Sequence, residues 1–422
     1  MNTYTIHAPS QLAATVALPA SKSVSNRAML IHALAGGHIL PDNLSDCDDT
    51  EVLIAALTHM APTIDIKAAG TAMRFITAYL AALPGGEHVV TGTERMRHRP
   101  IGPLVDALRM MGADIAYVGE EGFPPLRVKG QTLPGGKLEI PGNISSQYIS
   151  ALLLIAPVMA KGLELHLTGT IVSRPYIDLT LWMMREFGAN ADWSGADTIT
   201  VHPQPYAART YLIENDWSAA SYWYELTALY ATDASRVQLL GLMDGSKQGD
   251  SIVKYLFSLL GVRTAFDDTT SGVPTTVTLT RHLSRVQHLS FDFINCPDLA
   301  QTAVTTCCAL DIPFRFTGLA SLRIKETDRL QALITELGKL GYRLHSEGDT
   351  TLLWDGTRGD ATMEAIDTYE DHRMALAFAP LAVKFPGLKI NNPEVVSKSY
   401  PHFWRDLEAA GFVIHQTHDG QG

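Results

Sequence analysis

The segment Ala107-Leu108-Arg109-Met110-Met111-Gly112-Ala113 shows a pattern that recurs along the chain, in which an amphipathic helix-like run is followed by a glycine and then by a strand-like run. Glycine is the residue that most often ends a helix in the left-handed conformation. The same arrangement returns at Gly188, Gly261, Gly341 and Gly411, so the successive intervals are 76, 73, 80 and 70 residues. A nearly constant period indicates a duplicated unit. Units of about 75 residues predict almost six repeats in 422 residues, with a shortened first repeat that ends near residue 60 without a glycine.

Each repeat contains another helix-like segment, which begins with small or polar residues. These beginnings lie near Ser21, Gly70, Ser145, Asp216 and Asp298. The Ser and Asp residues among them are predicted as N-caps. Helix N-termini favour anions. Several of them beside Lys and Arg predict a shared anion site.

Strand-like segments alternate with these helices, which predicts an α/β (α+β) chain. The clearest examples are 137–140, 164–167, 237–240 and 275–279.

Composition excludes several classes of protein. The chain is 46% hydrophobic and 18% charged, as in globular proteins of two or three domains. Its net charge of −11 argues against nucleic-acid binding. We also expect no membrane span, no secretory signal and no metal site, because no long apolar run, leader pattern or metal-ligand spacing occurs. The four cysteines are expected to be buried free thiols.

Basic residues nevertheless gather in short motifs. Lys22 and Arg27 flank a helix start, and three arginines fall within 95–99. Lys325 and Arg329 are four residues apart, which predicts that they share one helix face, with Glu326 beside Arg329. Two further motifs are 371–375 and 396–401. Taken singly, the first motif also fits a capped helix with two solvated cations, the arginines at 95–99 fit a solvated loop, and the segment around Lys325 fits a charged surface helix.

Taken in order, these motifs resemble the signatures of the EPSP synthase family. The matching segments are 18–27, 70–74, 99–101, 145–147, 173–178, 325–329, 371–375 and 397–401. The resemblance implies an inverted α/β barrel with two lobes, three βαβαββ-type units in each lobe, and a cleft between the lobes. It places the chain crossings near Ala20 and Asn215, so that one lobe is 21–214 and the other is 1–20 with 215–422.

The resemblance also implies an activity. EPSP synthases transfer the enolpyruvyl group of phosphoenolpyruvate to the 5-hydroxyl of shikimate 3-phosphate and release phosphate, a step of chorismate and aromatic amino-acid biosynthesis. The family uses no metal or organic cofactor. We therefore expect a cytoplasmic monomer whose partners are these two small anions.

The site residues implied by the resemblance fall into three sets. Shikimate 3-phosphate is expected at Lys22, Ser23, Arg27, Ser145, Ser146, Gln147, Ser173, Tyr176, Asp298 and Lys325. Phosphoenolpyruvate is expected at Lys22, Gly70, Arg99, Gln147, Arg329, Arg373 and Lys398. The expected catalytic groups are Asp298 as base toward the hydroxyl, Glu326 as acid toward the methylene carbon, and Lys22 at the leaving phosphate.

The sequence departs from the family pattern at two polar positions. Ala68 and Ser321 stand where the family usually has asparagine, and Phe75 replaces a common proline or leucine. Two alternatives remain open. A transferase acting on UDP-N-acetylglucosamine shares the fold, but it typically has a cysteine in the loop before its Arg-Pro, and 95–100 contains none. A non-catalytic paralogue is the other alternative.

Overall fold

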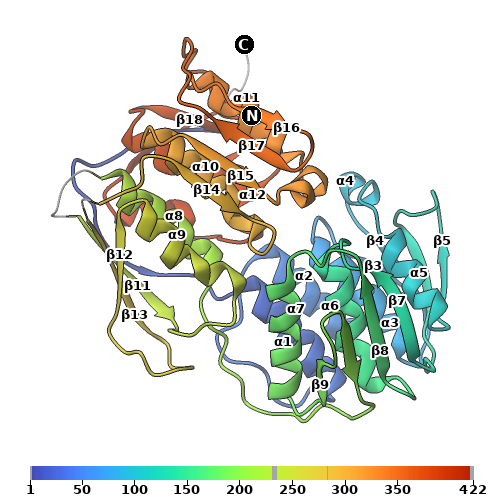
Figure 1. Ribbon diagram of the computed structural model, residues 1–422. Coiled ribbons are helices and arrows are strands. Elements are labelled where there is room, and N and C mark those ends of the chain that lie inside the picture. The colour runs from blue at the N-terminus through green and yellow to red at the C-terminus, as the bar shows by residue number, and fades with distance from the viewer. Residues whose placement is uncertain (1, 231–234, 283, 419–422) are drawn as a thin grey trace. The chain divides into compact units, whose positions relative to one another are not determined.

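The computed structural model describes residues 2–230, 235–282 and 284–418, and Figure 1 shows the order of its elements. The chain divides into an internal unit, Ala20–Ile213, and a terminal unit, Met1–Pro19 with Glu214–Gly422. Each unit encloses a hydrophobic core of its own.

Of the five sheets formed by the described residues, four share one topology, which explains the repeat in the sequence. The first two strands are parallel, and the second pairs with the fourth and the fourth with the third, both antiparallel. A helix connects the first strand to the second, as parallel neighbours require, and another connects the second to the third. Each sheet with its helices is therefore a βαβαββ unit. In one of them, β2 and β11 are separated in sequence by the whole internal unit.

The strands of these sheets include the segments expected at 137–140, 164–167, 237–240 and 275–279, which confirms those predictions. In the internal unit the sheets contain β3 (Thr63–Asp65), β4 (Glu87–Thr91), β5 (Asp114–Tyr117) and β6 (Leu126–Lys129), then β7 (Gly136–Pro141), β8 (Leu163–Thr168), β9 (Ala191–Trp193) and β10 (Thr198–Val201). In the terminal unit they contain β2 (Ala13–Ala17), β11 (Arg236–Leu242), β12 (Val262–Phe266) and β13 (Thr275–Arg281), then β14 (Leu289–Asp292), β15 (Phe314–Thr317), β16 (His345–Glu347) and β17 (Thr351–Trp354).

The fifth sheet joins the two ends of the chain. The first strand, β1 (Asn2–His7), lies between β18 (Leu388–Asn391) and β19 (Val413–His418) and is antiparallel to both. This pairing places the N-terminal strand within the last repeat of the terminal unit.

The first repeat of the internal unit consists of two helices. These are α1 (Lys22–Leu34) and α2 (Asp48–Thr58). The connection between them, residues 35–47, forms no strand and makes one isolated bridge, from Asp42 to Leu212.

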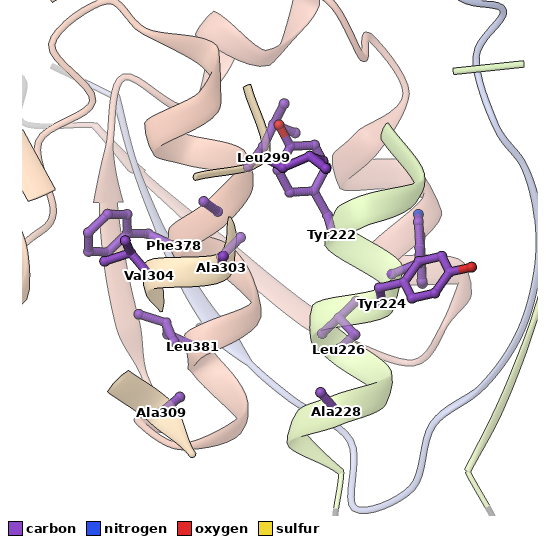
Figure 2. Close-up of a cluster of buried hydrophobic side chains, with 14 of the residues drawn as sticks. Tyr222, Tyr224, Leu226, Ala228, Leu299, Ala303, Val304, Ala309, Phe378 and Leu381 are labelled. Atoms are coloured by element: carbon purple, nitrogen blue, oxygen red, sulfur yellow. The ribbon is translucent and has the colours of Figure 1, made fainter. Parts of the chain in front are cut away.

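The first helix of each repeat is buried on nearly every side, which is typical of a helix at the centre of a core. These central helices are α1, α3 (Gly70–Ala82) and α6 (Ser146–Ile155) in the internal unit, and α8 (Trp217–Leu229), α10 (Ala300–Ala309) and α12 (His372–Phe378) in the terminal unit. Every residue of α10 and α12 is buried. Figure 2 shows the packed side chains between α8, α10 and α12, including Leu226, Val304 and Phe378.

The remaining helices lie outside these central ones. Among the described residues they are α2, α4 (Glu94–Arg97), α5 (Gly102–Met110), α7 (Arg174–Glu186), α9 (Val253–Leu259), α11 (Arg329–Lys339) and α13 (Phe403–Ala409). Short 3-10 turns are η1 (Ala156–Val158), η2 (Gly249–Ile252), η3 (Pro297–Leu299), η4 (Ala320–Ile324), η5 (Ala379–Val383) and η6 (Pro393–Lys398).

The five periodic glycines follow the outer helices in the left-handed conformation, with φ between 85° at Gly188 and 94° at Gly112 and Gly411. Gly261 and Gly341 have φ of 93° and 86°. The prediction that they end helices is therefore confirmed.

The four cysteines are free and buried, as expected. Among the residues that the structure describes, no helix has both the length and the apolar character needed to cross a membrane.

Candidate active site

The beginnings of the central helices carry the polar groups that the sequence singled out. The side chains of Ser21, Ser145 and Asp216 each accept a hydrogen bond from a backbone N–H of the following turn, which confirms these three N-caps. Asp298 was expected to be a cap as well, and this prediction is wrong. Asp298 lies in η3, just before α10, and its carboxylate faces cationic side chains.

In the terminal unit, Asp298 is surrounded by three cations. Its Oδ1 lies 3.1 Å from Arg329 Nη1 and 3.7 Å from Lys325 Nζ. Its Oδ2 lies 3.0 Å from Arg373 Nη2. The side chains of Arg329 and Arg373 are only 2% and 7% exposed, so these charges interact with little screening by water. Segments far apart in the sequence thus meet at one carboxylate.

Glu326 extends the same cluster. One carboxylate oxygen lies 2.9 Å from Arg329 Nη2 and the other lies 2.9 Å from Lys398 Nζ. Asp371 completes the cluster, since its fully buried carboxylate lies 2.7 Å from Arg329 Nε and also accepts a hydrogen bond from the Arg373 backbone N–H. Four cations therefore face three carboxylates, which leaves one net positive charge for an anionic ligand.

The expectation that Lys325 and Arg329 share a helix face is wrong. Helix α11 begins at Arg329, because Asp328 caps it by accepting a hydrogen bond from the Gln331 backbone N–H. Lys325 and Glu326 precede the helix in an irregular segment after η4. Glu326 still contacts Arg329, as predicted.

The cations determine the ionisation of Asp298. Burial alone would raise its pKa, but Arg373, Lys325 and Arg329 outweigh burial and hold that pKa well below its usual range. Asp298 favours the charged form of Lys325, yet burial and the neighbouring Arg329 lower the pKa of Lys325. The pKa of Arg329 is raised despite burial, because Asp371, Glu326 and Asp298 favour its charged form. The cluster therefore contains an ionised carboxylate beside fixed cations.

The internal unit contributes a second set of predicted residues, beginning with Lys22. Lys22 is the first residue of α1, and its Nζ lies 3.4 Å from Asp49 Oδ2 in the first turn of α2. The Lys22 side chain is 15% exposed and that of Asp49 is 5% exposed. Asp49 therefore restricts the position of the lysine ammonium.

Arg27 points into the internal unit rather than outward. Its Nε donates to Thr180 Oγ1 at 2.7 Å, its Nη1 to the Ser23 carbonyl at 2.8 Å, and its Nη2 to Ser150 Oγ at 3.1 Å. Burial lowers its pKa to about 10, although Tyr176 acts in the opposite direction. Most of its hydrogen-bonding capacity thus binds α1 to α6 and α7.

Gly70 begins α3 beside two arginines. A Cβ atom at this position would lie 2.7 Å from Arg99 Nη1, closer than Cβ atoms approach in real structures, and 3.0 Å from Arg74 Nη1, which is tighter than most real contacts. Arg74 donates to the carbonyls of Gly70 and Pro100, at 2.8 and 3.3 Å, and lies over the ring of Tyr148. Absence of a side chain at Gly70 is therefore what allows Arg99 to approach the start of α3.

The other predicted residues of the internal unit lie at the beginnings of α6 and α7. Ser145, Ser146 and Gln147 are partly exposed, and the Ser145 side chain caps α6. Ser173 precedes α7 in the left-handed conformation, with φ of 54°, and Tyr176 lies in the first turn. The structure thus places these five residues at helix starts, where backbone N–H groups can face an anion.

Comparison with known proteins identifies the family. The sequence model of EPSP synthase (3-phosphoshikimate 1-carboxyvinyltransferase) matches residues 6–64 and 58–407. This chain belongs to the EPSP synthase family. A 3-phosphoshikimate 1-carboxyvinyltransferase of Bacteroides fragilis is 56% identical over 412 residues, which cover 97% of this chain and 98% of the relative. One from a Sulfurovum species is 34% identical, covering 97% and 99%.

Solved structures of EPSP synthases have the same fold as this chain. An EPSP synthase of Acinetobacter baumannii superposes with a TM-score of 0.78, covers 99% of this chain and 100% of its own, and is 21% identical. The family and fold class expected from the motifs are therefore confirmed.

Sequence reasoning missed several residues that contact the predicted ones. Asp371 belongs to a quoted motif, yet only the structure shows its carboxylate against Arg329. Arg74 ends the quoted motif 70–74, although its contacts were not predicted, and Asp49 lies in a helix whose sequence looks like an ordinary amphipathic segment. The acidic first turn of α2 was a signal for Asp49, although it did not identify Lys22 as the partner.

Proposed function

We propose that this chain transfers the enolpyruvyl group of phosphoenolpyruvate to the 5-hydroxyl of shikimate 3-phosphate, giving 5-enolpyruvylshikimate 3-phosphate and inorganic phosphate. The observation that carries this proposal is the cluster around Asp298. It combines an ionised carboxylate with Arg329, Arg373 and Lys325 in one buried arrangement. The close relatives named above support the choice of substrates.

The reaction needs an addition followed by an elimination. In the addition, the acceptor oxygen bonds to C2 of phosphoenolpyruvate, loses its proton to a base, and a proton is added to the methylene carbon. In the elimination, the methyl group loses a proton, the double bond re-forms, and the C–O bond to phosphate breaks. One base, one acid and cations for the departing phosphate are therefore required.

Asp298 is the proposed base. Its low pKa keeps it ionised, which is the form that accepts a proton. The cations that hold this pKa low are also proposed donor ligands, Arg329 and Arg373. Anions bound to those arginines would offset their charge, raise the basicity of Asp298 and so couple donor binding to proton removal.

Glu326 is the proposed acid toward the methylene carbon, a role in which it takes up a proton when the anionic donor offsets the charge of its neighbouring cations and then gives that proton to the carbon. Its carboxylate contacts Arg329 and Lys398, both proposed ligands of phosphoenolpyruvate. A donor bound to these two cations would lie next to Glu326, so proton transfer would need no large movement of the side chain.

Lys22 is the proposed cation at the leaving phosphate, with its ammonium restrained by Asp49. Arg99 and the Gly70 backbone complete the proposed donor set, together with Gln147. For shikimate 3-phosphate we propose the partly exposed or helix-starting side chains, which are Lys22, Ser23, Ser145, Ser146, Gln147, Ser173, Tyr176, Asp298 and Lys325. Arg27 is the weakest member of the expected set, because it already donates to four protein oxygens.

We further propose that the protein acts in the cytoplasm as a monomer without metal or organic cofactor. We also propose two lobes bounded near residues 20 and 215, and the division of the chain into two compact units supports these bounds.

The test is acceptor-dependent phosphate release. Phosphoenolpyruvate is incubated with shikimate 3-phosphate and, separately, with UDP-N-acetylglucosamine. We expect phosphate to be released with shikimate 3-phosphate and not with UDP-N-acetylglucosamine. Release only with the second would identify the sister transferase, and release with neither would favour the non-catalytic paralogue.

A further inference from the structure

Tyr222 lies on α8, and no role in the reaction has been assigned to it. Its hydroxyl accepts a hydrogen bond from Arg373 Nη1 at 3.3 Å. Tyr222 and Arg373 are only 2% and 6% exposed, so water competes little for this contact. The guanidinium proposed to bind the donor is thus contacted by a buried phenol from another central helix.

Arg373 is held at two different nitrogens. Nη2 pairs with Asp298 Oδ2 at 3.0 Å, and Nη1 donates to Tyr222. These partners come from η3 and α8, whereas Arg373 itself is on α12. Two contacts in different directions fix the plane of a guanidinium, while a single contact leaves it free to rotate.

The phenol orients Arg373 without neutralising it. Burial raises the pKa of Tyr222 to about 12, although Arg373 acts in the opposite direction, so the hydroxyl stays uncharged. Arg329 is surrounded differently, since it pairs with three carboxylates. A neutral acceptor at Arg373 preserves more positive charge for an incoming anion.

Packing around the ring directs the Tyr222 hydroxyl toward Arg373. The Tyr222 ring makes an edge contact with Phe403 of α13, with ring centroids 6.1 Å apart. Figure 2 shows Tyr222 pointing from α8 toward Leu299, the residue that follows Asp298, while Tyr224 points from the other side of the helix. The Tyr224 hydroxyl instead forms a hydrogen bond with Thr264 Oγ1 of β12 at 2.9 Å. Tyr224 is therefore a matched control, because it is a tyrosine of the same helix whose hydroxyl is hydrogen-bonded to a different residue.

We propose that Tyr222 is a positioning residue that holds the Arg373 guanidinium in the orientation that binds phosphoenolpyruvate. This inference rests on the proposed role of Arg373 as a donor ligand. It predicts that the Tyr222 hydroxyl affects the Michaelis constant for one substrate and not for the other.

The experiment compares Tyr222→Phe, Tyr224→Phe, Arg373→Lys and the double variant Tyr222→Phe/Arg373→Lys. Steady-state phosphate release is measured with each substrate varied in turn, and melting temperature is recorded for every variant. Tyr222→Phe should raise KM for phosphoenolpyruvate about three- to tenfold, which corresponds to the net contribution of one typical hydrogen bond. Its KM for shikimate 3-phosphate should stay within about twofold. Tyr224→Phe should leave both constants unchanged.

The double variant separates positioning from general stability. If Tyr222 acts through Arg373, the Phe substitution adds less than about twofold in the Arg373→Lys background. A full additional effect there would overturn the inference, as would an unchanged KM for phosphoenolpyruvate in Tyr222→Phe. If Arg373→Lys itself leaves that KM unchanged, the proposed role of Arg373 fails first, and the inference about Tyr222 fails with it.

Discussion

Replacing Gly70 with alanine tests the geometry of the donor site with a single methyl group. The new Cβ would lie 2.7 Å from Arg99 Nη1, whereas ordinary contacts begin at 3.4 Å. Arg99 must therefore move by about 0.7 Å or the start of α3 must shift. Displacements of about 1 Å at a positioning group cost roughly a hundredfold in catalysis. We expect kcat/KM for phosphoenolpyruvate to fall about ten- to a hundredfold.

The same substitution should not weaken the fold. Gly70 does not have the positive φ that would strain alanine, and alanine favours helices over glycine by about 1 kcal/mol. Gly70→Ala should therefore lower kcat/KM while the stability of the fold rises or stays unchanged.

Gly338→Ala is the matched control, because Gly338 is also in a helix and its added Cβ would meet nothing within 4 Å. Phosphate release with phosphoenolpyruvate varied at saturating shikimate 3-phosphate measures the effect. A kcat/KM within twofold of the unmodified protein for Gly70→Ala would refute the placement of Arg99.

Three further predictions concern other parts of the structure. Asp371→Asn should lower the free energy of unfolding by about 3 kcal/mol, because buried Arg329 loses one of three carboxylates; urea unfolding measures this, and an unchanged midpoint would contradict it. Burial raises the pKa of Glu225 well above 4.5, so its contribution to stability is present below about pH 4.5 and is lost as pH rises through the folded-state pKa. Glu225→Gln should therefore lose less stability than the unmodified protein between about pH 5 and about pH 8, and identical pH dependence would contradict the assignment. Ala68 is exposed beside α3, so Ala68→Asn should fit and lower KM for phosphoenolpyruvate about threefold; an unchanged KM would show that the usual asparagine is dispensable here.

Local features could be predicted from the sequence because they depend on near neighbours. The glycines that end helices need only their own backbone conformation, and Ser21 and Asp216 cap the turn that follows them. The spacing of the glycines predicted a repeated unit of about 75 residues, whereas the βαβαββ form of that unit was implied by the family resemblance.

Contacts between distant segments could not be predicted from residue patterns. The pairs Asp371–Arg329 and Asp298–Arg373 join residues 42 and 75 positions apart, and their geometry depends on how α10, α11 and α12 pack. Arg27 illustrates the same limit, since its position in a basic motif does not indicate that Ser150 and Thr180 bind its guanidinium. Asp328 caps α11, so this helix begins at Arg329 and does not extend back through Lys325.

The most direct test of the account is hydrogen exchange at the methylene carbon of phosphoenolpyruvate. The addition creates a methyl group that must lose a proton again, so the reaction in D2O with shikimate 3-phosphate should place deuterium in the methylene of 5-enolpyruvylshikimate 3-phosphate. Glu326→Gln should slow this incorporation by a factor on the order of a hundred or more. Unlabelled product from the unmodified protein, or undiminished incorporation by Glu326→Gln, would contradict the proposed chemistry of the Asp298 cluster.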